Sequence, residues 1–222
     1  MSLEIHDLRY AHPGSKRGIH LSEFALAQGE TLAVVGPSGT GKTTFLNLLA
    51  ALVRPDSGKI RVNDFAVENL GNLQAQAYRA RSVGYIFQDF GLLEYLDARD
   101  NILHPFRIAR GRRITPEIRR TVDARAMELG LTDRLNHHPA QLSHGERQRV
   151  AICRAILTEP EVILADEPTG NLDPETAAQI MDHLLAVRAR LGATFIMVTH
   201  DHGLLDRFDR VLDFRHLWGD LA

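Results

Sequence analysis

The chain has 222 residues, enough for one large domain, and 44% of them are hydrophobic, as in a globular protein with a substantial core. Its 26 basic and 28 acidic residues are interspersed and give a formal net charge of −2, so no basic block indicates nucleic-acid binding. The longest apolar stretch, Phe45 to Val53, falls well short of the roughly 20 residues of a membrane span. The N-terminus lacks the basic-then-apolar pattern of a signal peptide, and the single cysteine, Cys153, lies in an apolar run that predicts a buried thiol.

Short runs of β-forming residues recur along the chain, and several are continuously apolar, which is typical of strands covered on both faces of a parallel sheet. From about Asp89 to Ile156 the pattern is helical, with no convincing strand. The sequence therefore predicts an α/β core formed by residues 1–88 and 157–222, with a helical insertion at 89–156. The predicted strands are Leu3–Ile5, Thr31–Val35, Val83–Phe87, Val162–Ala165, Thr194–Val198 and Val211–Phe214.

The clearest predicted helix begins after Asp173, a good N-cap, with Pro174 at its first position, and ends before Gly192. Apolar residues recur along it every three or four positions and mark one buried stripe. These residues are Ala177, Ile180, Leu184, Val187 and Leu191.

A glycine-rich segment follows the predicted strand Thr31–Val35 and matches the phosphate-loop pattern G-x-x-x-x-G-K-[ST]. Its glycines allow backbone N–H groups to surround phosphate oxygens, and the helix that follows adds a partial positive charge. Lys42 is expected to reach the β- and γ-phosphates, and the Thr43 hydroxyl to coordinate Mg²⁺. The alternative is a glycine-rich turn with an unrelated lysine. The residues predicted to bind the nucleotide here are Gly36, Pro37, Ser38, Gly39, Thr40, Gly41, Lys42, Thr43 and Thr44.

Two adjacent carboxylates, Asp166 and Glu167, follow the apolar strand Val162–Ala165. A carboxylate at the end of a buried strand is costly unless it is paired or bound to a metal, which indicates that Asp166 holds Mg²⁺. Glu167 can then act as the general base that polarises the attacking water. The alternative is a pair of solvated turn carboxylates before Pro168.

Two further polar residues follow predicted strands. His200 comes after Thr194–Val198 and is interpreted as a sensor of the γ-phosphate; a polar turn or a metal pair with His202 is the alternative. Gln88 follows Val83–Phe87 and could reach Mg²⁺ or the attacking water. Taken alone, Gln88 carries little information, and its assignment depends on the other residues of the set.

The segment Leu142–Glu146 precedes a helical run that extends from Arg147 to Leu157. Ser143 and Glu146 have the spacing of a capping box, which needs no functional explanation. A capped helix start is also an anion site, and Gly145 permits close backbone approach. Local physical chemistry does not choose between these two interpretations.

Taken together and in their order along the sequence, these segments resemble those of the ATP-binding-cassette (ABC) ATPases. The resemblance extends over nearly the whole chain. The resemblance implies an α/β fold of the P-loop NTPase (RecA-like) type in a single domain, residues 1–222. It implies a mainly parallel sheet, a small antiparallel β part at the N-terminus and an inserted helical subdomain. The segments that carry the resemblance are Gly36–Thr43, Gln88, Leu142–Glu146, Val162–Glu167, Asn171-Leu172-Asp173 and His200.

The resemblance also implies roles for single residues. The signature residues Ser143, Gly145 and Glu146 would bind the γ-phosphate of ATP held on a partner subunit, in a head-to-tail pair. Gln88, Asp173 and His200 correspond to the family's Q-loop, D-loop and switch histidine, and Tyr10 to an aromatic residue that stacks on adenine. For Tyr10, at the end of the first predicted strand, core packing is the alternative. Two features depart from the family pattern: His144, where glycine is usual, and the tail His216–Ala222.

Within the family, Tyr85–Leu93 and Asp166–Asp173 most resemble the branch of lipoprotein-releasing, macrolide-exporting and cell-division ATPases, which work with a separately encoded membrane subunit. We therefore expect ATP and Mg²⁺ as ligands and a second copy or a homologous ATPase subunit as partner. We also expect an integral membrane permease, no nucleic acid, and a peripheral location on the cytoplasmic face of the inner membrane. The apolar stretch Phe90–Leu96 could be core or a docking surface for the permease. The alternative function is a soluble ABC ATPase that is not coupled to transport.

Overall fold

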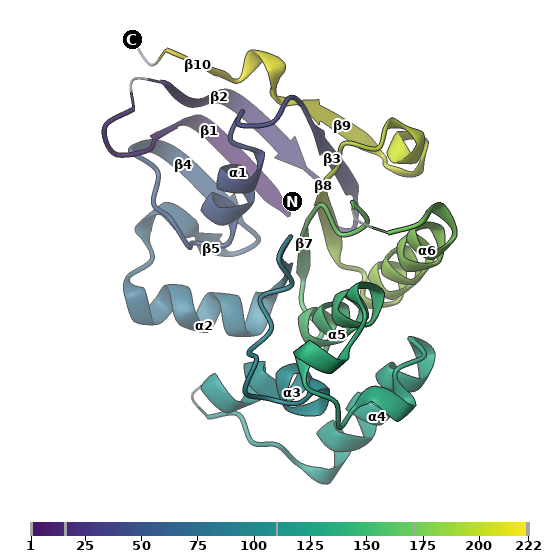
Figure 1. Ribbon diagram of the computed structural model, residues 1–222. Helices are drawn as coiled ribbons and strands as arrows, with labels where there is room; N and C mark the ends of the chain where they lie inside the picture. Colours follow the sequence, from purple (N-terminus) through teal and green to yellow (C-terminus); the bar gives the residue numbers. More distant parts are fainter. Residues whose placement is uncertain (1, 16, 110, 171, 221–222) are drawn as a thin grey trace.

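The structure is a computed structural model and describes residues 2–15, 17–109, 111–170 and 172–220 (Figure 1). Its strands form two five-stranded sheets. The first sheet is antiparallel and has the strand order β10-β2-β1-β4-β5. It brings the C-terminal tail back beside the N-terminal strands, with Trp218 opposite Ile19. Its strands are β1 (Leu3–Ala11), β2 (Arg17–Leu26), β4 (Ser57–Val62), β5 (Phe65–Ala66) and β10 (Trp218–Asp220).

The second sheet is parallel, with the strand order β6-β7-β8-β3-β9. Successive residues of its central strands point to opposite faces, and both faces are buried. Val34 lies in the core shared with the antiparallel sheet, for example, whereas its neighbour Ala33 lies in the core on the other face. The predicted parallel sheet is confirmed, with strands β3 (Thr31–Val35), β6 (Val83–Ile86), β7 (Val162–Asp166), β8 (Thr194–Val198) and β9 (Arg210–Asp213).

Helices complete the layers on both sides of the parallel sheet (Figure 1). Helix α1 (Lys42–Leu49) packs in the core between the two sheets, and the buried Tyr78 of α2 (Asn72–Ser82) joins the same core. Helices α5 (His144–Ile156) and α6 (Pro174–Leu191) supply side chains to the core on the opposite face. Helix α5 approaches β6 so closely that a Cβ atom at Gly84 would lie 2.4 Å from the Ala155 carbonyl oxygen.

Helix α6 has the predicted boundaries because its ends are encoded locally. The Asp173 carboxylate accepts a hydrogen bond from the Thr176 N–H (3.0 Å), and Gly192 ends the helix in the left-handed conformation (φ 61°). Helix α1 is shorter than the apolar run Phe45–Val53 indicated, since the chain turns at Ala51, which has a φ of 52°.

The segment between residues 89 and 156 is helical, as predicted, and the structure places no strand among its described residues. It contains α3 (Ala98–Ile108) and α4 (Pro116–Glu128), which lie farthest from the antiparallel sheet in Figure 1, and then α5. The thiol of Cys153 on α5 is fully buried, and burial raises its pKa to about 12. No helix within the described ranges is long and apolar enough to cross a membrane.

The fully buried side chain of Asn101 on α3 fixes the loop that follows β6. Its amide oxygen accepts a hydrogen bond from the Leu93 N–H (2.8 Å), and its amide nitrogen donates to the carbonyls of Leu93, Leu96 and Asp97 (3.0–3.1 Å). Replacement by alanine leaves these backbone groups without partners.

We therefore expect Asn101→Ala to lower the free energy of unfolding by about 1–3 kcal/mol, the cost of unsatisfied buried polar groups. Urea denaturation of the wild type and the variant measures it. Asn69→Ala is the matched control, because Asn69 is exposed and its loss should cost less than about 0.5 kcal/mol. Equal stability of both variants would contradict the role of Asn101.

Candidate nucleotide site

Polar residues gather where the parallel strands end. Gly36 follows β3, Gln88 lies just beyond β6, Asp166 ends β7 with Glu167 next to it, and His200 lies just beyond β8. Because the strands are parallel and adjacent, these ends meet at one edge of the sheet, the edge at which open α/β sheets bind ligands.

The loop Gly36–Thr43 wraps around its own lysine. The Lys42 ammonium donates hydrogen bonds to the carbonyls of Gly36 (2.8 Å) and Pro37 (2.9 Å), and the residue is only 6% exposed. Burial lowers the pKa of Lys42, whereas Glu167 and Asp166 act in the opposite direction. The first helical hydrogen bond of α1 runs from the Phe45 N–H to the Gly41 carbonyl (2.8 Å), so the preceding N–H groups lie before the helical bonding pattern and can face an anion.

Asp166 is a buried carboxylate that is incompletely paired. It is 3% exposed, and its Oδ1 atom has no hydrogen-bond partner among the residues that the structure describes. Burial raises the pKa of Asp166, and the Thr43 hydroxyl and Lys42 partly oppose this effect. Thr43, Gln88 and Asp166 line one cavity. A buried carboxylate oxygen without a partner, beside a hydroxyl and an amide oxygen, fits the hard oxygen ligands that Mg²⁺ prefers.

Glu167 lies between the other two predicted catalytic residues. Its Oε1 is 2.9 Å from His200 Nε2, and its Oε2 accepts a hydrogen bond of 3.4 Å from the Gln88 amide. Its backbone is held in the left-handed region (φ 48°), and its N–H donates to the Val198 carbonyl (3.0 Å). A non-glycine residue held in this conformation is a typical feature of functional sites.

Tyr10, the residue expected to stack on adenine, lies near the end of β1. It is 8% exposed and belongs to the core between the two sheets. Its hydroxyl lies 3.4 Å from Nδ1 of His12, whose Nε2 lies 3.3 Å from the Thr44 hydroxyl. No sequence motif marks His12, a single histidine in the turn after β1.

The signature segment forms the predicted capping box at the start of α5. The Ser143 N–H donates to the Glu146 carboxylate (2.7 Å), and the Ser143 hydroxyl accepts from the Glu146 N–H (3.3 Å). Arg134 also donates to Glu146 (2.6 Å). Gly145 faces Leu172, close to the cap of α6, so the structure brings the signature near Asp173. Asn171 lies outside the described residues.

His144 uses its side chain within its own chain. Its imidazole ring packs edge to face against the ring of Phe90, with 4.7 Å between centroids. Phe90 is buried and lies two residues after Gln88. The departure from the family's glycine therefore adds a contact between the signature and the segment that follows Gln88.

Comparisons with known proteins agree with this geometry. A family model described as "ABC transporter" matches residues 19–170. The chain belongs to this family. The lipoprotein-releasing system ATP-binding protein LolD of Coxiella burnetii is 42% identical over 195 residues, which cover 87% of this chain and 83% of the relative. The uncharacterized ABC transporter ATP-binding protein YknY of Bacillus subtilis is 41% identical over 198 residues, or 89% and 84% of the two chains.

Solved structures support the same assignment. The ATP-binding cassette MJ0796, in a dimeric post-hydrolysis state with ADP and phosphate, superposes with a TM-score of 0.85 at 30% identity and covers 95% of this chain and 93% of its own. A second dimeric structure of MJ0796 gives 0.87 at 29% identity, with 99% of both chains covered. The chain is therefore an ATP-binding subunit of the ABC transporter type and an ATPase.

The ion pair at the signature predicts a dependence of stability on pH. Hydrogen bonds from the Ser143 backbone and from Arg134 lower the pKa of Glu146 to about 2, from an ordinary value of 4.5. A lowered pKa in the folded state stabilises the fold fully above about pH 4.5, and this contribution is lost as the pH falls towards 2. Glu146→Gln should therefore be less stable than the wild type at pH 7, and the difference should shrink at pH 3.5. Urea unfolding at both values measures it, and a difference independent of pH would contradict the ion pair.

Proposed function

We propose that two copies of the chain close head to tail on two Mg-ATP and that this closure drives a separate integral membrane permease, from a position on the cytoplasmic face of the inner membrane. The observation that carries the proposal is the division of the site. Lys42, Asp166 and Glu167 meet at the ends of the parallel strands. Among the described residues, the side-chain hydrogen bonds of the signature join Ser143, Glu146 and Arg134, and so do not link the signature to these three residues of its own chain. The dimeric cassettes named above support a two-subunit arrangement.

Hydrolysis would use the residues at the strand ends. The N–H groups of Gly36–Thr43 and the Lys42 ammonium bind the phosphates, and Glu167 accepts the proton of the attacking water. Gln88 and His200, which already contact Glu167, orient its carboxylate and the γ-phosphate. Mg²⁺, held by Asp166, Thr43 and Gln88, would supply charge neutralisation at the β- and γ-phosphates.

The signature would complete the site of the other subunit. The N-terminus of α5 carries a partial positive charge, and Gly145 leaves space for an anion to approach the backbone. Ser143, Gly145 and Glu146 would thus bind the γ-phosphate of ATP on the partner, with Asp173 next to them at the interface. The capping box fixes the Ser143 side chain, so this end of α5 is preorganised before the partner subunit binds.

The experiment is ATP-dependent dimerisation. Glu167→Gln should keep ATP bound and lower turnover by roughly 10²–10⁴-fold, the usual contribution of a general base, so the variant should elute as a dimer in size-exclusion chromatography with ATP and Mg²⁺. Near-wild-type turnover in Glu167→Gln would refute the assignment of the base.

A second substitution isolates the signature. Ser143→Arg in the same background should leave ATP binding at the P-loop intact and return the protein to a monomer, since the side chain occupies the position of the partner's γ-phosphate. Ser143→Ala is the matched control and should cost only about 1 kcal/mol of stability through the lost cap. A persistent ATP-dependent dimer in the Ser143→Arg variant would reduce Leu142–Glu146 to a helix cap.

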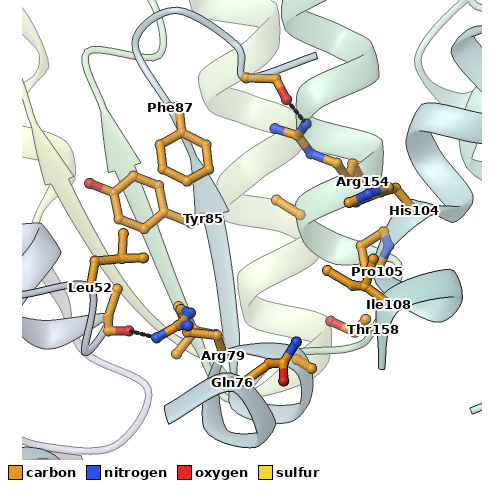
Figure 2. Close-up of a pocket in the computed structure, with 15 residues that line it drawn as sticks. Leu52, Gln76, Arg79, Tyr85, Phe87, His104, Pro105, Ile108, Arg154 and Thr158 are labelled. Carbon is orange, nitrogen blue, oxygen red and sulfur yellow. Dashed lines mark hydrogen bonds between the residues drawn. The ribbon is translucent and has the colours of Figure 1, made fainter. Parts of the chain in front are cut away.

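A groove between α2 and α3 supports coupling to a permease (Figure 2). Apolar side chains line it, and the rim residues Leu52 and Ile108 are 44% and 50% exposed. Its charged and titratable lining residues, within the described ranges, are Arg79, Arg154, His104 and Tyr85, with no carboxylate among them. The proposed occupant is therefore a cytoplasmic segment of the permease that presents apolar side chains and a carboxylate. Phe90–Leu96 is mixed: Phe90 is core, Leu92 packs against the core, and Tyr95 is 74% exposed.

Ile108→Asp tests this groove. In the host cell, affinity-tagged wild-type chain should co-purify with a membrane protein that has several hydrophobic spans, and the variant should lose most of it while it retains basal ATPase activity. Met127→Asp on α4 is the control, because Met127 is 70% exposed but does not line the groove. Loss of activity and solubility together would show that Ile108 belongs to the core, and retained co-purification would place the permease elsewhere.

A further inference from the structure

The C-terminal segment, residues 214–220, contains the described part of the tail that departs from the family pattern. After β9 the chain makes a short turn at Phe214–His216 and then forms β10 at the edge of the antiparallel sheet. Backbone contacts hold this segment in place. The His20 N–H donates to the Leu217 carbonyl (2.9 Å), and Trp218 lies opposite Ile19.

The ring of Trp218 lies against the end of the phosphate loop. Gly41, the last residue before α1, has a φ of 86°, and a Cβ atom at this position would lie 3.1 Å from Cε3 of Trp218 and 3.0 Å from the Ile19 side chain. The Gly41 carbonyl accepts the first helical hydrogen bond of α1, from the Phe45 N–H (2.8 Å). Trp218 and Ile19 therefore back the point at which the loop becomes a helix, directly before Lys42.

The same segment contacts the beginning of the loop through Phe214. A Cβ atom at Gly36 would lie 3.1 Å from Cβ of Phe214. The Phe214 side chain is fully buried, and its ring packs against Phe45 of α1 with 5.3 Å between centroids. One short segment thus contacts both ends of the loop whose N–H groups would surround the phosphates.

A glycine-rich loop needs such support more than other loops do. Glycine loses more backbone freedom than any other residue when its conformation is fixed. A loop that is already held in its bound conformation loses less of this freedom when the ligand binds, so the affinity is higher.

We propose that Trp218 is a positioning residue for phosphate binding. Its ring holds Gly41, and with it the start of α1, in the conformation that receives the phosphates. The proposal rests on nucleotide binding at Gly36–Thr43 and assigns a role in that binding to the C-terminal segment.

Calorimetric titration of the full chain with Mg-ADP and with Mg-pyrophosphate tests the proposal, and the ATPase consumes neither ligand. Trp218→Ala should weaken the binding of both ligands by roughly ten-fold, because the ligand must then order the loop itself. Trp218→Phe keeps a ring against Gly41 and should bind both ligands within a few-fold of the wild type.

Phe65→Ala is the matched control. Phe65 is a partly buried aromatic residue on β5, at the opposite edge of the same sheet, where its ring packs against Tyr78 with 4.9 Å between centroids. Both alanine variants should unfold several degrees below the wild type, because each removes packed aromatic surface. At a temperature at which both remain folded, only Trp218→Ala should lose affinity for the two ligands.

Three outcomes of the titrations would overturn the proposal. Wild-type affinity of Trp218→Ala would show that its ring does not act on the loop. An equal loss of affinity in Phe65→Ala would show a general effect of lower stability. A loss for ADP alone would place Trp218 at the nucleoside instead of behind the phosphate loop.

The fluorescence of Trp218 gives a direct second measurement, since it is the only tryptophan in the sequence. Its emission should change when either ligand saturates the wild type, because the loop that its ring contacts then holds phosphate. Lys42→Ala should show no change at the same concentrations, since it lacks the charge-assisted phosphate contact. Constant emission while calorimetry shows full occupancy would overturn the proposal. A wild-type chain that binds neither ligand would refute the nucleotide site itself, and this role with it.

Discussion

Lys42 carries a positive charge into a site in which it is only 6% exposed, and the fold must replace the hydration that this charge has lost. The carbonyls of Gly36 and Pro37 accept two hydrogen bonds from it, and Asp166 and Glu167 supply opposite charge. Both carbonyls belong to the loop that must hold phosphate. The lysine therefore joins the two ends of the loop's first turn, and a phosphate can offer it an anionic acceptor in place of these neutral carbonyls.

This arrangement requires strands of the same direction, because only parallel strands bring their C-terminal ends to one edge. The sequence reveals these strands through continuous apolar runs such as Thr31–Val35 and Thr194–Val198, which the structure confirms. It also reveals α6, whose cap and terminal glycine lie within the helix's own sequence. Strands β2, β4, β5 and β10 were not predicted individually. Exposed polar residues interrupt the apolar pattern of β2 and β4, and β5 and β10 are only two and three residues long. The pairing of β10 also depends on a partner remote in sequence, since Trp218 lies opposite Ile19.

The same limit on prediction from the sequence applies to the single residues of the site. Motif residues such as Asp166 and Glu167 could be predicted because each follows a recognisable strand. For Tyr10 the sequence could not decide between a core position and an exposed one, since its burial depends on how the two sheets enclose the end of β1. For the signature, the structure could be predicted but the role could not. Its capping box forms as the local sequence predicts, and the geometry within one subunit fits both a helix cap and a phosphate site. The contact between His144 and Phe90 joins residues far apart in sequence and has no local signal at all.

That contact belongs to a larger connection between the groove and the catalytic residues. Arg154 on α5 donates hydrogen bonds to the carbonyls of Phe90 and Gly91 while its side chain lines the groove (Figure 2). Phe87, also in the groove, directly precedes Gln88, whose amide contacts Glu167. A segment bound in the groove would therefore touch the residue next to Gln88 and the arginine that fixes the loop after it. The Gln88 amide contacts the general base, and the packing of His144 against Phe90 joins the same loop to the start of α5. The short segment after β6 thus directly contacts the groove, the catalytic carboxylate and the signature helix.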